Sequence, residues 1–262
     1  MNEKHRAKKS LGQNFLKDEN IIAQIIQYVS PGKSQHFIEV GPGLGALTKA
    51  ILPFVGSLDA IEFDKDVIPE LEKACKEKGV LRIHQADALK FDFSTLIKGA
   101  DKARVIGNLP YNISTPLLFH LITFSKKIQD MHFMLQKEVV DRICASLGTK
   151  RYGRLTVMLQ YYCKAEFLFE VPPEAFTPKP KVDSAILRLV PYDRPPYPAK
   201  NMETLSIVVR TAFNQRRKTL RNTLKSIISE EELQALGIDP KQRPEQTSLK
   251  AFVDIANFKE AL

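Results

Sequence analysis

The chain has 262 residues, with 39 lysines and arginines against 30 aspartates and glutamates, so its formal net charge is +9. Its hydrophobic fraction of 44% excludes a disordered chain, and no run approaches the roughly 20 apolar residues of a membrane span. We expect a soluble cytoplasmic protein with one large domain, or a large domain and a small one. The three cysteines are widely spaced and the five histidines lie at no metal-ligand spacing, so neither a disulfide framework nor a metal site is predicted.

Short apolar runs alternate with amphipathic segments through the first part of the chain. This alternation predicts an α/β fold with a doubly wound, mostly parallel sheet. Ligands of such sheets bind beyond the carboxyl ends of the strands. We expect strands at 36–40, 57–62, 80–84, 103–108 and 131–135, and helices at 20–29, after residue 45, and at 67–77, 116–124 and 137–147.

The pattern changes after residue 169. Eight prolines fall between Pro172 and Pro198, interrupted by a strand pattern at 185–190. Proline fixes the backbone without supplying an amide, which indicates a rigid loop, a late strand of the sheet and then a linker. Beyond residue 198 the apolar positions follow helical spacing. The sequence therefore predicts a ligand-binding domain at 1–193 and a small all-α domain at 194–262.

A glycine-rich turn follows the first predicted strand. Gly41, Gly43 and Gly45 would let a ligand approach the backbone closely at the start of a helix. Glu62 comes 21 residues after Gly41, close to the spacing at which an acidic side chain accepts hydrogen bonds from ribose hydroxyls. Asp87 follows the third strand and could accept from an adenine amino group, or it could simply cap the next turn. The glycines alone are also compatible with an ordinary tight turn.

The segment Asn108-Leu109-Pro110-Tyr111 follows the fourth strand. Methylation of an exocyclic adenine nitrogen is difficult because its lone pair is delocalised into the ring. The Asn108 carbonyl and a backbone carbonyl near Leu109, held by Pro110, could accept the two amino hydrogens and stabilise the developing charge. Tyr111 could stack on the base. The segment thus predicts chemistry on an adenine amine, against the alternative of a plain turn.

Basic residues are concentrated where acids are missing. No acid lies between Glu203 and Glu230, and a second acid-free stretch runs from Arg142 to Lys164. A third basic group, around Lys4 to Lys9, opens the chain. Such blocks favour binding of a polyanion, although each alone could be a solvated helix face. The basic residues of the main block are Arg210, Arg216, Arg217, Lys218, Arg221 and Lys225.

Together, the glycine turn, Glu62, Asp87 and the Asn108–Tyr111 segment resemble the S-adenosylmethionine-dependent rRNA adenine dimethyltransferase family. The opening segment 9–16 resembles the amino-terminal cofactor motif of that family, which implies that Asn14 and Leu16 contact the methyl donor. Residues 176–184 resemble its target-base loop, which implies that Phe176 and Tyr111 hold the base between them. Phe176 could instead anchor the proline-rich loop. The resemblance implies a Rossmann-like class I methyltransferase fold, S-adenosylmethionine as cofactor and S-adenosylhomocysteine as product.

Residues 213–222 resemble the small-subunit branch of this family more than the large-subunit branch. The resemblance implies N6-dimethylation of two adjacent adenosines in a hairpin loop near the 3′ end of 16S rRNA, within the immature 30S subunit. A single-stranded loop suits such chemistry, because its bases can be splayed onto aromatic side chains. We expect a monomer that acts without a membrane and has a role in subunit biogenesis.

Other functions use related patterns. A ribosome-assembly factor would need only the basic surface. A nicotinamide dehydrogenase would share the sheet, but its third glycine comes one residue later and it needs no Asn-x-Pro-Tyr turn. DNA adenine and protein glutamine methyltransferases use similar turns and stay open at this point.

Overall fold

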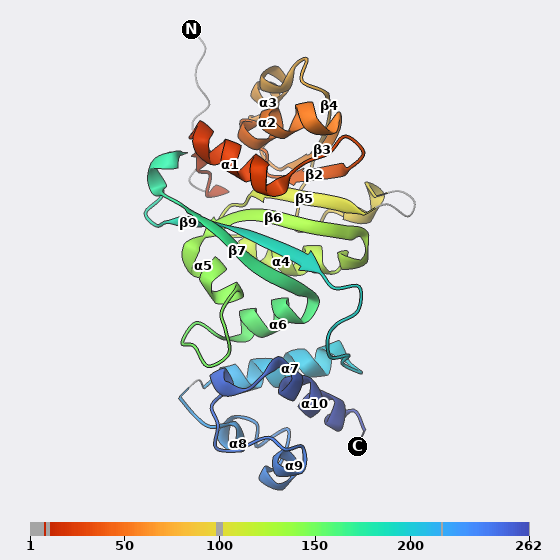
Figure 1. Ribbon diagram of the computed structural model, residues 1–262, viewed down its shortest axis with the longest axis vertical. Coiled ribbons are helices and arrows are strands. Elements are labelled where there is room, and N and C mark those ends of the chain that lie inside the picture. Colours follow the sequence, from red (N-terminus) through yellow and green to blue (C-terminus); the bar gives the residue numbers. More distant parts are fainter. Residues whose placement is uncertain (1–7, 9–10, 98–101, 216, 262) are drawn as a thin grey trace. The chain divides into compact units, whose positions relative to one another are not determined.

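A computed structural model describes residue 8 and residues 11–97, 102–215 and 217–261 (Figure 1). The chain divides into two compact units, one of residues 1–140 and 166–191, the other of residues 141–165 and 192–262. The strands are β1 (Phe15–Leu16), β2 (His36–Val40), β3 (Ser57–Glu62), β4 (Val80–Gln85), β5 (Ala103–Asn108), β6 (Ile128–Gln136), β7 (Cys163–Val171), β8 (Phe176–Thr177) and β9 (Ser184–Pro191). The helices are α1 (Glu19–Val29), α2 (Ala46–Val55), α3 (Ile68–Cys75), α4 (Ser114–Ile122), α5 (Lys137–Ile143), α6 (Arg154–Tyr162), α7 (Met202–Phe213), α8 (Leu220–Thr223), α9 (Glu230–Ala235) and α10 (Leu249–Lys259).

The main sheet has seven strands in the order β4-β3-β2-β5-β6-β9-β7. The pairs of β2 with β3 and β5, of β3 with β4, and of β5 with β6 are parallel, and β9 pairs with β6 antiparallel. Figure 1 shows these strands following one another across the first unit. The chain order reverses at β2, so the carboxyl ends of β2, β3 and β5 form the switch point where ligands bind in such sheets. The predicted α/β fold is confirmed.

Helix α1 begins and ends as its sequence dictates. The Asp18 side chain caps its amino terminus by accepting from the amides of Asn20 and Ile21, and Ser30 ends it in a left-handed conformation. The buried face of α1 carries Ile22, Ile25 and Val29, which pack in the core with residues of β2, α2 and β9. Helical spacing of these apolar residues thus fixes α1 against the sheet.

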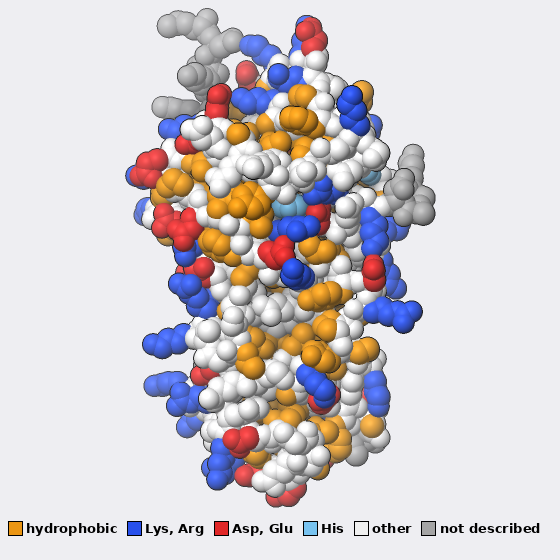
Figure 2. Space-filling view, in the orientation of Figure 1, with side chains coloured by type: hydrophobic (Ala, Val, Ile, Leu, Met, Phe, Trp, Pro, Cys, Tyr) orange, Lys and Arg blue, Asp and Glu red, His pale blue; other side chains and the backbone are white. Residues whose placement is uncertain are grey.

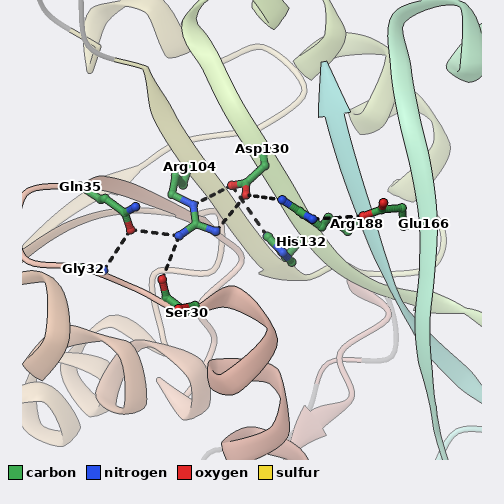
Figure 3. Close-up of polar contacts among 8 residues, drawn as sticks. All are labelled: Ser30, Gly32, Gln35, Arg104, Asp130, His132, Glu166 and Arg188. Carbon is green, nitrogen blue, oxygen red and sulfur yellow. Dashed lines mark hydrogen bonds and ion pairs between the residues drawn. The ribbon is translucent and has the colours of Figure 1, made fainter. Parts of the chain in front are cut away.

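A buried polar network joins β5, β6 and β9 (Figure 3). Arg104 of β5 donates to both carboxylate oxygens of Asp130 on β6, at 2.7 and 2.9 Å, and also to Gln35 and to the Ser30 carbonyl at the end of α1. His132 lies beside Asp130, and burial lowers the pKa of its imidazole to about 4. Because Arg104 lies near the start of β5, the network stabilises the sheet at the end away from Asn108.

The second unit is helical. In it α7 packs against both α6 and α10, and the Tyr152 hydroxyl donates to the Thr247 carbonyl at 3.1 Å. None of the helices within the described residues is both long enough and apolar enough to cross a membrane.

Two features differ from the sequence-based expectations. Residues 141–165, assigned from sequence to the first domain, group with residues 192–262, because α6 packs on α7 and α10. The strand β7 is absent from the expected strands, since it is an edge strand whose half-exposed residues give no clear apolar alternation. The predicted change of architecture near residue 193 falls close to the break at 191–192.

Candidate functional site

A cavity of about 710 Å³ lies at the carboxyl ends of β2, β3 and β5. Its volume lies within the range of small-molecule sites. The segment 11–17 and Thr177 complete its wall. All but one of the site residues predicted from sequence line it: Asn14, Leu16, Gly41, Gly43, Glu62, Asp87, Asn108, Leu109, Pro110 and Tyr111.

The glycine turn has the backbone that its sequence predicts. Gly41, Gly43 and Gly45 have φ of 66°, 55° and 79°, in the left-handed region that side chains disfavour. A Cβ on Gly43 would lie 3.0 Å from the Phe15 ring. The turn therefore brings bare backbone to the cavity at the start of α2, as a close-approaching ligand requires.

Glu62 is held rigidly at the end of β3. Its Oε2 accepts from the Gly43 amide at 3.0 Å and its Oε1 from the Asp64 amide at 2.8 Å. Burial raises the pKa of this carboxyl. A carboxylate has about four acceptor positions, so two hydrogen bonds leave capacity for the hydroxyls of a ribose.

Asp87 caps the turn after β4 and also lines the cavity. Its Oδ1 accepts from the Leu89 amide at 3.0 Å, which is the turn-capping arrangement. The residue also lines the cavity, and its Oδ2 lies 4.0 Å from Lys90 Nζ. The capping bond uses Oδ1, and the carboxylate keeps further acceptor positions at Oδ2.

The Asn108 side chain is fixed by a backbone carbonyl. Its Nδ2 donates to the Asn14 carbonyl oxygen at 2.8 Å. A carbonyl can only accept, so this contact requires the amino side of the amide to face Asn14 and leaves Oδ1 as the acceptor on the other side. The turn after Asn108 is anchored by the Leu109 amide, which donates to Met134 of β6.

Tyr111 is anchored at its hydroxyl. The Tyr111 hydroxyl lies 2.7 Å from Ser184 Oγ at the start of β9, and burial raises its pKa. The half-buried ring lines the cavity next to Asn108. This hydrogen bond anchors the far end of the ring beside the cavity, where the ring can serve as a stacking platform for a base.

Phe176 does not take the position predicted for it. Its side chain is 2% exposed, packs in the core with Leu16 and Ile22, and is not among the residues that line the cavity. Its backbone pairs with Leu16 in the small sheet of β1 and β8. Phe176 does not face the cavity in this structure, and its pairing with Tyr111 around a base stays a prediction. The alternative, a ring that anchors the proline-rich loop, describes the packing.

Sequence reasoning assigned no role to three further residues near the cavity. Glu39 is fully buried at the end of β2, and burial raises the pKa of its carboxyl to about 8. Phe63 follows Glu62 and lines the cavity with 61% of its surface exposed. Asp64 is buried beside Glu62 and contacts the segment that covers the cavity. Phe63 directly follows Glu62 and Glu39 lies two residues before Gly41, and this closeness to the motif residues is the signal that could have found them.

The main basic block lies in the second unit. Arg210 lies in the last turn of α7. Arg221 lies on α8 and pairs with Glu230 at 3.5 Å, and Arg217, Lys218 and Lys225 are exposed. Arg216 and the basic residues Lys4, Arg6 and Lys9 lie outside the described residues. Figure 2 shows lysine and arginine side chains projecting along one side of the part that carries α7 and α8. Among the described residues, no group of His, Cys, Asp or Glu is arranged to hold a metal ion.

Comparison with known proteins agrees with this geometry. Residues 4–261 match the ribosomal RNA adenine dimethylase family. The chain belongs to this family. It is 53% identical over 257 residues to a ribosomal RNA small subunit methyltransferase A of Vibrio vulnificus, a match that covers 98% of this chain and 96% of that one. Its identity to the protein of the same name from Pseudomonas aeruginosa is 53% over 253 residues, covering 97% and 94% of the two chains.

Solved structures agree with the family assignment. A dimethyladenosine transferase from Plasmodium falciparum has a TM-score of 0.80 at 26% identity, covering 94% of this chain and 98% of that one. The 23S rRNA methyltransferase ErmE shares the fold with a TM-score of 0.74 at 23% identity, covering 93% and 100%. The chain is thus an S-adenosylmethionine-dependent methyltransferase of the rRNA adenine dimethylase family, and the predicted activity and cofactor are confirmed.

Proposed function

We propose that this protein dimethylates N6 of two adjacent adenosines in a hairpin loop near the 3′ end of 16S rRNA, within the immature 30S subunit. The observation that carries the proposal is the Asn108 amide, which presents an oxygen acceptor at the cavity beside the Tyr111 ring. The names of the bacterial relatives, which specify the small ribosomal subunit, support the choice of substrate. They also support a cytoplasmic enzyme, and we expect it to act as a monomer.

The residues around the glycine turn fit S-adenosylmethionine. Gly41 and Gly43 offer unobstructed backbone, and Glu62 offers carboxylate oxygens for the ribose hydroxyls. Asp87 can accept from the adenine amine of the cofactor, and Asn14 and Leu16 complete the wall of the cavity. When bound, the cofactor supplies an electrophilic methyl group.

The Asn108 turn supplies the acceptors for the target. Asn108 Oδ1 and the backbone carbonyl near Leu109 accept the two hydrogens of the adenine amine as its nitrogen becomes pyramidal. Removal of one such preorganised partner costs on the order of 10²–10³ in rate in comparable sites. Tyr111 holds the base by stacking, which contributes roughly 1–3 kcal/mol.

The two units divide the work. In the proposal, residues 1–193, apart from the stretch 142–164, bind the cofactor and carry out the reaction, and residues 194–262 bind rRNA. The second acid-free stretch, from Arg142 to Lys164, belongs to the same compact unit as the main basic block. Residues 142–164 therefore extend the rRNA-binding surface that we propose.

A pair of variants tests the proposed site. Asn108→Ala removes the side-chain acceptor, so we expect methyl transfer to small subunits that lack these methyl groups to fall at least about 100-fold. Binding of S-adenosylhomocysteine, measured by calorimetry, should stay within a few-fold of wild type. Glu62→Ala removes the ribose acceptor, so it should weaken S-adenosylhomocysteine binding first.

The outcomes discriminate between the roles. Undiminished turnover of Asn108→Ala would remove the proposed role of the amide. Wild-type affinity of Glu62→Ala for S-adenosylhomocysteine would remove the ribose assignment. Mapping of methylated adenosines on subunits from cells that lack the protein, before and after its addition, identifies the nucleotides.

A further inference from the structure

Residues 11–16 line the cavity, and this segment sets the orientation of Asn108. Its Asn14 carbonyl accepts from Asn108 Nδ2 at 2.8 Å. If this carbonyl moved away, the amide could rotate and present its NH₂ group toward the amine of the target base. Two donors facing each other cannot form a hydrogen bond. The position of Asn14 therefore decides whether the cavity offers an acceptor.

Among the described residues, contacts near both ends position this segment. At its far end, β1 pairs with β8, and the Lys17 amide donates to the Ala175 carbonyl at 2.8 Å. Between residues 11 and 14 the chain forms a turn and then irregular backbone. The near end is held by contacts of Lys8 and Gln13 to the loop after β3.

Asp64 is the residue of that loop on which these contacts converge. Its carboxylate accepts from Lys8 Nζ at 2.6 Å and from Gln13 Nε2 at 2.9 Å. It is buried, with 4% of its surface exposed. Burial opposes the charge, but the hydrogen bonds from Lys8 and Gln13 outweigh it and lower the pKa of Asp64. A buried carboxylate held by charge-assisted bonds is a stiff anchor.

Asp64 also contacts Glu62, the residue proposed to bind the ribose of the cofactor. The Asp64 backbone amide donates to Glu62 Oε1 at 2.8 Å. Asp64 therefore connects the carboxylate proposed for the ribose with the segment that orients Asn108. Asp64 itself does not line the cavity among the described residues.

We propose that Asp64 is a positioning residue for methyl transfer, which acts through Gln13 and the Asn14 carbonyl to hold the Asn108 amide with its oxygen toward the target adenine. This inference rests on the proposed role of Asn108. It assigns no contact with cofactor or RNA to Asp64.

The test compares Asp64→Asn with Asp66→Asn. Asp66 also accepts from Lys8 Nζ, at 2.6 Å, but has no contact with Gln13 and is half exposed, so it is a matched control for the lysine contact. We expect the single-turnover rate on unmethylated small subunits, at saturating cofactor, to fall about 10-fold for Asp64→Asn and less than 2-fold for Asp66→Asn. Affinity for S-adenosylhomocysteine should change less than 3-fold in both. Equal rates in the two variants, or a loss confined to cofactor affinity, would overturn the inference.

A double-mutant cycle separates positioning from general loosening. If Asp64 acts through Asn108, adding Asp64→Asn to Asn108→Ala should reduce the residual rate by less than 2-fold, whereas independent effects would multiply to a further 10-fold loss. The multiplied result would overturn the inference. If Asn108→Ala alone keeps full activity, the proposed function fails, whatever Asp64→Asn does. Should Asp64→Asn fail to fold, Gln13→Met provides a second variant, because it keeps the Asp64 carboxylate paired with the Lys8 ammonium. Its rate on small subunits should also fall about 10-fold. A wild-type rate would overturn the inference.

Discussion

Two carboxyl groups at the ends of neighbouring strands differ in how they are held. Burial raises the pKa of both groups, but Glu62 accepts backbone hydrogen bonds that oppose this shift, whereas Glu39 is fully buried and its pKa is raised to about 8. Burial disfavours the charged form of an acid. At neutral pH Glu39 is therefore mainly protonated in the folded chain.

This difference predicts how stability depends on pH. Between its ordinary pKa of 4.5 and about 8, Glu39 keeps its proton in the folded chain and loses it in the unfolded chain. The unfolded chain then binds fewer protons, so Glu39 lowers stability as pH rises through this window, and its effect is constant above about 8. Glu39→Gln should thus raise Tm more at pH 8 than at pH 5. The corresponding gain in unfolding free energy should be larger at pH 8 by at least about 1 kcal/mol.

Thermal melts without cofactor, followed by circular dichroism, measure this difference. The exposed Glu72→Gln serves as the control for replacing a glutamate by glutamine outside the core. An equal gain at both pH values for Glu39→Gln would contradict the raised pKa.

At the residue scale, the sequence predicted the residues that end parallel strands better than it predicted the place of Phe176. Asn108 and Glu62 lie at the cavity because the carboxyl end of a parallel strand places them there. Phe176 does not lie at the cavity. Burial of an aromatic ring stabilises the folded chain at any apolar site, and the core offers such a site beside Leu16. The sequence shows the ring but not which of the two sites it fills.

At the scale of elements, Gly107 shows how closely β5 and β2 approach each other next to the site. A Cβ at Gly107 of β5 would lie 2.5 Å from the Val40 carbonyl oxygen and 3.0 Å from Leu109 Cδ2. The nearer atom is backbone and cannot rotate away. The strand therefore needs glycine just before Asn108.

Gly107→Ala should consequently lower the unfolding free energy by roughly 1–3 kcal/mol or more, because β5 must shift away from β2. Cofactor binding should weaken as well, since both strands end at the cavity. Denaturant unfolding and calorimetry with S-adenosylhomocysteine measure the two effects. Gly153→Ala is the control, because the nearest atom to its added Cβ is 3.9 Å away. If the two variants were equally stable, the close approach of β5 and β2 would be refuted.

The elements that sequence identified are those with a strong pattern. β2, β3 and β5 have the predicted bounds because parallel strands buried on both faces are short continuous apolar runs. β7 has no such run, as it is an edge strand that is buried at its two ends and partly exposed between them. Its pairing with β9 depends on contacts distant in sequence, which local patterns do not contain.

At the scale of the whole molecule, charge separates the two units. The cavity and its carboxylates belong to the first unit, and both acid-free stretches, 142–164 and 204–229, belong to the second. An excess of cations with few nearby acids attracts phosphates at long range. This distribution also fits a binding role in subunit assembly that would persist without catalysis.

Neutralisation of the main basic block tests that role. Replacing Arg217, Lys218 and Lys225 by Gln should weaken binding to small subunits and reduce the slope of log affinity against log salt by roughly 0.7–0.9 for each phosphate that the protein no longer neutralises. The control replaces Lys241, Lys250 and Lys259 of the same unit. If the slope of log affinity against log salt did not change, the main basic block would be a solvated surface that does not bind RNA. A catalytically inactive Asn108→Ala protein that still restored subunit assembly would separate binding from methyl transfer.

The sequence by itself determined the parallel sheet, the glycine turn, the Asn108–Tyr111 segment and the basic block, because each depends on residues that are adjacent along the chain. Tertiary structure alone decided three further features. Asp64 meets Lys8 and Gln13 across more than 50 positions, the Asn14 carbonyl fixes Asn108 from 94 positions away, and Phe176 enters the core. The physical reason is that hydrogen bonds and packing act over a few ångströms in space, and only the folded chain brings these groups within that range.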